Sequence, residues 1–125
     1  MDIKELQIGN WLMHNAKAKQ IVEIDSRGDS VIFSDDWTIS VDLSHCQPIE
    51  LTEELLNKNF IQRLDDWQIT SAWYVKQFVD GKYQIGTFND AYSTPSFTFV
   101  FRTTYVHQLQ NTLKFIAPAK TIVIP

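Results

Sequence analysis

Apolar and polar residues alternate through much of the first fifty positions, a pattern that predicts short antiparallel strands. The alternation is clearest over residues 37–43, where a period of two predicts a strand with one buried face. The side chains of that face are Trp37, Ile39, Val41 and Leu43. Other strand-like runs are 6–14, 20–24 and 31–34. Residues 1–50 therefore predict a small antiparallel sheet or barrel of SH3-like size.

A short helix is predicted directly after this sheet. Thr52 can cap the free N–H groups of a first turn, and Glu53 and Glu54 favour the positive end of the helix dipole. Asn59 can end the helix in the left-handed conformation. We therefore expect an SH3-like β subdomain at residues 1–50 and a second segment at 51–125, which together form one continuous unit.

Strands return in the second segment. Asp80-Gly81 is a strong hairpin signal and predicts a two-residue loop between strands at 72–79 and 82–88. That loop would divide the side chains of the two strands between two faces. One face would carry Tyr74, Lys76 and Phe78 with Tyr83, Ile85 and Thr87. The other face would carry Trp73, Val75, Gln77 and Val79 with Lys82, Gln84 and Phe88. A further strand would follow, with Phe97, Phe99 and Phe101 on one face.

A second helix is predicted after these strands, capped by Thr103 or Thr104. Its apolar positions follow helical spacing and must face a core. They are Val106, Leu109, Leu113 and Ile116. Pro118 ends this helix, and residues 121–124 are expected to add an edge strand. The fold class is therefore α+β: an SH3-like sheet, a short helix, then an antiparallel meander with a C-terminal helix.

Composition indicates a core that needs neither disulfide nor metal. The chain has 125 residues, of which 44% are hydrophobic and 13% aromatic, so it can bury ample apolar area. Cys46 is its one cysteine, which excludes an internal disulfide and fits a reducing compartment. The sequence shows no signal peptide and no apolar run long enough to span a membrane. We expect a cytoplasmic protein.

The net charge of −4 is unevenly distributed. Residues 1–66 carry 13 acidic and 6 basic side chains, whereas residues 67–125 carry 2 acidic and 5 basic ones. Binding of nucleic acid by the whole protein is disfavoured, because neutralising phosphates requires concentrated Lys and Arg. One hypothesis is therefore that the second half presents a modestly basic surface. The plainer interpretation is that its charges are scattered and solvated.

Three segments are distinctive: 6–10 (LQIGN), 48–56 (PIELTEELL) and 105–111 (YVHQLQN). In this order they resemble a family of small uncharacterised bacterial proteins that are common in prophages and other mobile elements. The resemblance spans most of the chain and implies no activity, ligand or catalytic residue. The chain departs from the family at Asn59, where a helix-ending Gly is usual, and in the tail 117–125.

No arrangement of residues predicts catalysis. The histidines are His14, His45 and His107, and no two of them have the spacing of a zinc-binding helix. His45 and Cys46 would point to opposite faces of a strand. The acidic pairs at 35–36 and 65–66 fit turns better than a shared cleft. We therefore expect no enzyme, no metal and no cofactor.

Two candidate binding surfaces remain. The first is an exposed Trp67 or Trp73 beside Lys82 and Gln84, since aromatic and cationic side chains concentrate binding energy at interfaces. The second is the polar helix face of His107, Gln110, Asn111 and Lys114. For each residue the plain alternative is core packing or a solvated face.

Three functions stay open. The leading hypothesis is a non-enzymatic binding or accessory module that acts through protein–protein interaction or self-association. A nucleic-acid-associated SH3-like module is the alternative. An enzyme without a recognisable motif is the third, and it requires a pocket that joins at least two of His14, His45, Cys46, His107 and the acidic pairs.

Overall fold

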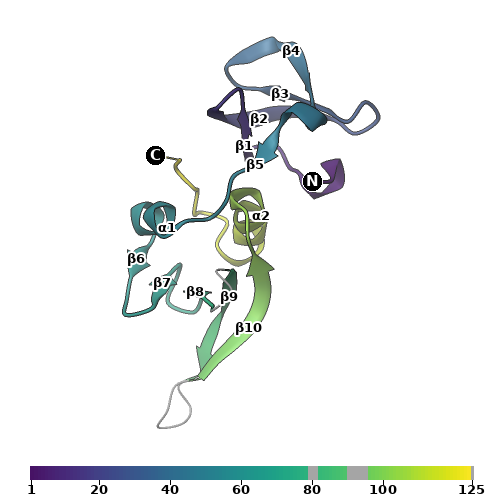
Figure 1. The fold of residues 1–125 in the computed structure, drawn as a ribbon. Coiled ribbons are helices and arrows are strands. Elements are labelled where there is room, and N and C mark those ends of the chain that lie inside the picture. Colours follow the sequence, from purple (N-terminus) through teal and green to yellow (C-terminus); the bar gives the residue numbers. More distant parts are fainter. Residues whose placement is uncertain (79–81, 90–95, 125) are drawn as a thin grey trace. The chain divides into compact units, whose positions relative to one another are not determined.

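The computed structural model describes residues 1–78, 82–89 and 96–124, which form an α+β chain of two antiparallel sheets (Figure 1). They group into two compact units. Unit 1 contains Met1–Glu50, Tyr105–Asn111 and Ile124. Unit 2 contains Leu51–Thr104 and Thr112–Val123.

Unit 1 is built on a five-stranded sheet with the order β4-β3-β2-β1-β5. Its strands are β1 (Trp11–His14), β2 (Lys17–Asp25), β3 (Ser30–Phe33), β4 (Asp36–Asp42) and β5 (Gln47–Pro48). Short 3₁₀ turns lie at Ile3–Glu5 and Leu43–His45. Among the described residues the sheet ends at β4 and β5 without closing, so the predicted SH3-like barrel is not confirmed.

The core of unit 1 gathers apolar side chains from β1, β2 and β3 and from the two 3₁₀ turns with the residues that follow them. Its buried members are Ile3, Leu6, Leu12, Ile21, Val31, Phe33, Leu43 and Cys46. The tight turn between β1 and β2 requires left-handed backbone at Asn15 (φ 51°) and Ala16 (φ 60°). That geometry matches the right-handed twist of the two strands and fixes their register.

Strand β4 does not bury the predicted face. Its register pairs Val41 with Val31 and Asp36 with Phe33. Between these two pairs, the four residues 37–40 of β4 lie opposite the single residue Ile32 of β3. This irregularity breaks the alternation. Trp37 is 66% exposed and Ile39 is 54% exposed, whereas Leu43 is buried. The prediction that one face of 37–43 is buried was wrong for its first half.

Unit 2 is an antiparallel meander with the order β10-β9-β8-β7-β6. Its strands are β6 (Ile61–Gln62), β7 (Asp66–Gln68), β8 (Tyr74–Gln77), β9 (Tyr83–Asn89) and β10 (Ser96–Thr103). One face of this sheet carries the buried Trp67, Val75 and Ile85. Helix α1 (Glu53–Asn59) begins at the predicted cap, since Thr52 Oγ1 accepts from the Leu55 N–H at 3.2 Å.

Asn59 ends α1 differently from the prediction. Its backbone does not adopt a positive φ, and its side chain donates to the Leu55 carbonyl at 2.9 Å. The same side chain exchanges hydrogen bonds with the backbone of Val123, at 3.0 and 2.7 Å. Residues 121–124 form no strand, so the predicted edge strand was wrong, and the tail is held at the end of α1 instead.

The register of β8 and β9 differs by one residue from the prediction. Gln77 pairs with Tyr83, and the Phe78 N–H donates to the Lys82 carbonyl at 2.9 Å. The predicted Asp80-Gly81 turn itself lies outside the described residues. A shift of one residue moves each side chain of a strand to the other face. Tyr74 and Lys76 therefore share a face with Gln84 and Phe88, not with Tyr83 and Ile85.

A bulge in β10 divides its phenylalanines. Phe99 pairs with Gly86, but Phe101 pairs with Ile85, because the register shifts between them. Phe101 therefore lies on the face of Ile85, while Phe97 and Phe99 lie on the opposite face. The predicted single row of the three rings was wrong.

Helix α2 (Val106–Ile116) confirms the predicted apolar stripe, since Val106, Leu109 and Leu113 are buried. It begins later than predicted, where the side chain of Gln108 accepts from the Tyr105 N–H at 3.1 Å. Its residues up to Asn111 group with unit 1 and those from Thr112 with unit 2. Within the described ranges, neither this helix nor α1 is long and apolar enough to cross a membrane.

Candidate functional site

The face of the second sheet opposite Trp67 and Val75 carries aromatic side chains. Residues paired directly across antiparallel strands share a face, which places Tyr74 of β8 beside Gly86 of β9 and Gly86 beside Phe99 of β10. Phe88 and Phe97 pair on the same face. We call this set the aromatic face: Tyr74, Phe78, Phe88, Phe97 and Phe99.

The rings of the aromatic face contact one another. Tyr74 and Phe88 meet edge to face, with ring centroids 4.9 Å apart. The ring centroid of Phe97 lies 5.2 Å from that of Phe88 and 6.4 Å from that of Phe78. Such pairs each contribute about 1 kcal/mol beyond the area they bury. The rings are thus held in place, yet Phe78 is 37% exposed and Phe99 is 43% exposed.

Cationic side chains lie over these rings. The Arg63 guanidinium is 4.7 Å from the centroid of Tyr74 and 5.2 Å from that of Phe88. Lys76 lies 6.0 Å from the centroid of Phe97. Arg102 lies 5.6 Å from that of Phe99. These are cation–π distances, so the aromatic face presents apolar area and positive charge together.

Two of the cations also pair with carboxylates. Arg63 Nε lies 3.2 Å from Asp66 Oδ1, and Lys76 Nζ lies 3.6 Å from Asp65 Oδ2. Burial raises the pKa of the Asp66 carboxyl, and Arg63 opposes that rise. The ion pair therefore holds Arg63 on the aromatic face, and Arg63 in turn stabilises the charged form of Asp66.

Gly86 makes the packing of the aromatic face possible. A Cβ atom at this position would overlap the carbonyl oxygen of Thr98 and would lie 2.8 Å from Cζ of Phe97. The ring of Phe97 and the backbone of β10 therefore occupy the space that any side chain of residue 86 would need.

The tryptophans predicted for binding lie on the other side of this sheet. Trp67 is 2% exposed, and its indole N–H donates to Asn57 Oδ1 at 2.8 Å, so it is a core residue. Trp73 is half-buried, with its ring 6.2 Å from that of Phe101. Lys82 is exposed and Gln84 is half-buried opposite Lys76, on the aromatic face. The one-residue shift in register separates the predicted pairs.

The predicted polar face of α2 is not one surface. Gln110 accepts from the Trp11 N–H at 2.9 Å and donates to the Gly9 carbonyl at 3.0 Å. Asn111 accepts from the Asn10 side chain at 2.9 Å and donates to the Glu5 carbonyl at 2.7 Å. These amides connect α2 to the start of unit 1. Lys114 is exposed and His107 is buried.

His107 predicts a dependence of stability on pH. Its ring is 1% exposed, lies parallel to that of Tyr105 and finds no hydrogen-bond partner in the described part of the chain. Burial lowers the pKa of His107 below its ordinary value of 6.5, while Glu5 opposes the shift. The unfolded chain then binds the proton first, so the free energy of unfolding falls as the pH drops below 6.5.

Chemical denaturation across this pH range measures the effect. The His107→Phe variant keeps an aromatic ring beside Tyr105 and removes the titrating group, so its stability should vary less between pH 7 and pH 5, values that bracket the ordinary His pKa of about 6.5. An identical pH dependence in both proteins would contradict the assignment.

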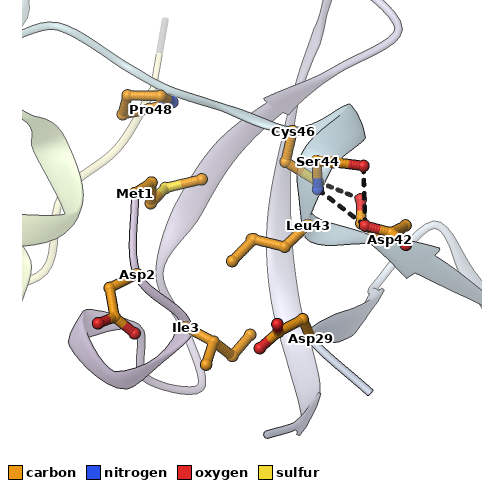
Figure 2. A pocket seen from close by; sticks show the side chains of 9 residues that line it. All are labelled: Met1, Asp2, Ile3, Asp29, Asp42, Leu43, Ser44, Cys46 and Pro48. Carbon is orange, nitrogen blue, oxygen red and sulfur yellow. Dashed lines mark hydrogen bonds between the residues drawn. The ribbon is translucent and has the colours of Figure 1, made fainter. Parts of the chain in front are cut away.

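Cys46 lies at a hollow of about 760 Å³ in unit 1 (Figure 2). Asp2, Asp29 and Asp42 also line this hollow. Asp42 is committed to the turn, because it accepts from the N–H and hydroxyl of Ser44, and these bonds lower the pKa of Asp42. Burial raises the pKa of the Cys46 thiol, which disfavours the reactive thiolate. Neither Asp42 nor Cys46 is therefore set up as a reactive group in this hollow.

A smaller hollow of unit 1 joins residues from separate segments of the sequence. It measures about 180 Å³, and its lining includes His14, Lys19, Asp35 and Asp36. Lys19 Nζ lies 3.0 Å from His14 Nδ1 and 3.1 Å from Asp35 Oδ2. This hollow meets the geometric condition for an enzyme, since it joins a histidine to an acidic pair. Its lining offers no hydroxyl or thiol nucleophile, however.

The described residues include no group of three or more His, Cys, Asp or Glu side chains arranged to hold a metal ion. Comparison with protein-family models, with curated proteins and with solved structures gives no match to this chain.

Proposed function

We propose that the protein is a non-catalytic binding module and that its aromatic face contacts a protein partner that presents acidic and apolar side chains. The aromatic face carries this proposal, because it combines partly exposed rings with cations on one rigid sheet. Aromatic and arginine side chains are enriched at protein interfaces, and the few residues that dominate the binding energy are often of these types. Rings that are already packed lose little conformational freedom on binding.

Nucleic acid fits this face less well. Arg63 and Lys76 already pair with carboxylates, which weakens their attraction for phosphate. Arg63 also covers the rings of Tyr74 and Phe88, on which bases would have to stack. Acidic side chains of a protein can instead approach the exposed Arg102 beside Phe99.

The test is a pull-down from the native host with and without nuclease. Wild-type protein is compared with the Phe99→Ser/Arg102→Ser double variant, which removes an exposed ring and its cation. Phe115→Ser is the matched control, because Phe115 is an equally large ring that is 80% exposed and belongs to α2, not to the strands that carry the aromatic face. A protein partner should survive nuclease and bind the double variant about tenfold or more weakly, since interface hot spots contribute about 2 kcal/mol or more each.

Equal recovery of that partner by the wild type and the double variant would contradict the proposal. Loss of all partners on nuclease treatment would favour the nucleic-acid alternative instead. Recovery of the bait alone, with a monomeric wild type in sedimentation, would also argue against a protein-binding role.

A further inference from the structure

Strand β4 is an edge strand with large exposed apolar side chains. It ends the first sheet, and Trp37 and Ile39 are more than half exposed on it. Proteins usually protect such an edge with lysine, proline or a covering segment. Here the bulged part of β4 presents an indole and an isoleucine to solvent, which is typical of a surface that a partner covers.

The smaller hollow lies beside this edge. Ile39 and Val41 of β4 form part of its wall, together with Phe33 at the end of β3. Its volume of about 180 Å³ is below the roughly 300–1,000 Å³ of sites for drug-sized ligands. A hollow of this size suits one side chain of a partner.

The surroundings of the edge are acidic. Asp35 and Asp36 lie at the start of β4, and Asp42 ends it. Lys19, which pairs with Asp35 at this edge, is largely buried, because its side chain is 14% exposed. Unit 1 as a whole carries nine acidic and four basic side chains. The partner that this charge attracts is basic.

We propose that the β4 edge docks an extended basic segment of a partner protein. The segment adds to the sheet alongside β4 and places an apolar side chain in the smaller hollow. One of its Lys or Arg side chains lies over the indole of Trp37, next to the carboxylates of Asp35 and Asp36. This surface belongs to unit 1 and is independent of the aromatic face.

A second copy of the chain fits this edge poorly. Two β4 strands paired antiparallel about their centre, Ile39, would place Asp36 of each copy opposite Asp42 of the other. Like charges directly opposite each other destabilise a strand pair. The same carboxylates repel nucleic acid, so a basic peptide segment is the occupant that the charges favour.

Selection from a library of random linear peptides on the immobilised full chain tests the proposal. We expect enriched peptides in which Lys or Arg alternates with apolar residues. Their affinity, measured by fluorescence anisotropy, should fall about tenfold or more in Trp37→Ser, as for a central aromatic anchor. It should also fall in Asp35→Asn/Asp36→Asn, with a weaker dependence on salt.

Phe99→Ser/Arg102→Ser serves as the control and should bind these basic peptides like the wild type. Amide NMR shifts caused by the peptide should map to β4 and to the turn before it. The proposal is overturned if no basic consensus is enriched, or if Trp37→Ser binds the selected peptides as tightly as the wild type. An acidic consensus that depends on Phe99 would instead report on the aromatic face and would leave β4 without its proposed partner.

Discussion

Replacing Trp67 with alanine is expected to lower the free energy of unfolding by about 4 kcal/mol, the cost of deleting a large aromatic side chain from a core. Trp67 is 2% exposed on β7 and meets Tyr83 edge to face, with ring centroids 6.0 Å apart. Denaturant titration followed by circular dichroism measures the change. A loss of about 1 kcal/mol or less would show that Trp67 is not the centre of the unit 2 core.

Trp67→Phe separates packing from hydrogen bonding. Phenylalanine keeps most of the buried area and loses the bond from the indole N–H to Asn57, whose side chain is exposed enough to bond with water instead. We expect this variant to lose about 1–2 kcal/mol, well below the loss in the alanine variant.

Gly86→Ala is expected to cost about 3 kcal/mol, at the upper end of overpacking effects. The added methyl group meets the backbone carbonyl of Thr98 and the ring of Phe97. Because the carbonyl belongs to a paired strand, it cannot move aside as a flexible side chain would. Thermal unfolding reports the loss of stability, and near-ultraviolet circular dichroism reports the disturbed aromatic face.

Gly28→Ala is the matched control for this substitution. Its Cβ would lie 3.0 Å from Oδ2 of Asp25, the end of an exposed side chain that needs to shift by only a few tenths of an ångström. We expect a change within about 0.5 kcal/mol, as for surface substitutions in general. Equal effects at Gly28 and Gly86 would show that close packing at Gly86 is not the cause.

The elements that are encoded locally could be predicted from the sequence. The cap at Thr52 depends on residues within one turn, and it forms as expected. The stripe that includes Val106, Leu109 and Leu113 follows from helical geometry alone, and it is buried. In both elements the physical cause lies within a few residues of its effect.

The faces of the strands could not be predicted, because each depends on a register that one residue changes. Turn propensity at Asp80-Gly81 suggested one pairing, whereas Gln77 pairs with Tyr83. In β4 the inserted residues leave the apolar alternation in the sequence intact while exposing Trp37. Alternation reports that two faces differ, and it does not report which face the core will cover.

The candidate sites were missed for the same reason. The aromatic residues at 74 and 78 were visible as a pattern, but the expected register placed them with the buried Ile85. His14, Lys19 and Asp35 come together only because β1, β2 and β3 are neighbours in the sheet. Nothing in the separate segments indicates that their side chains meet.

The contacts of Gln110 and Asn111 bear on the order in which the protein is made. Their hydrogen bonds reach back to Gly9 and Asn10, about a hundred residues earlier in the chain. During synthesis the first fifty residues emerge long before these partners exist, so unit 1 is completed only after Gln110 and Asn111 have been made. A nascent chain stalled before Tyr105 should therefore leave the backbone N–H of Trp11 and the side-chain amide of Asn10 without the partners that α2 supplies. We expect it to be a better substrate for chaperones and proteases than a chain that contains α2.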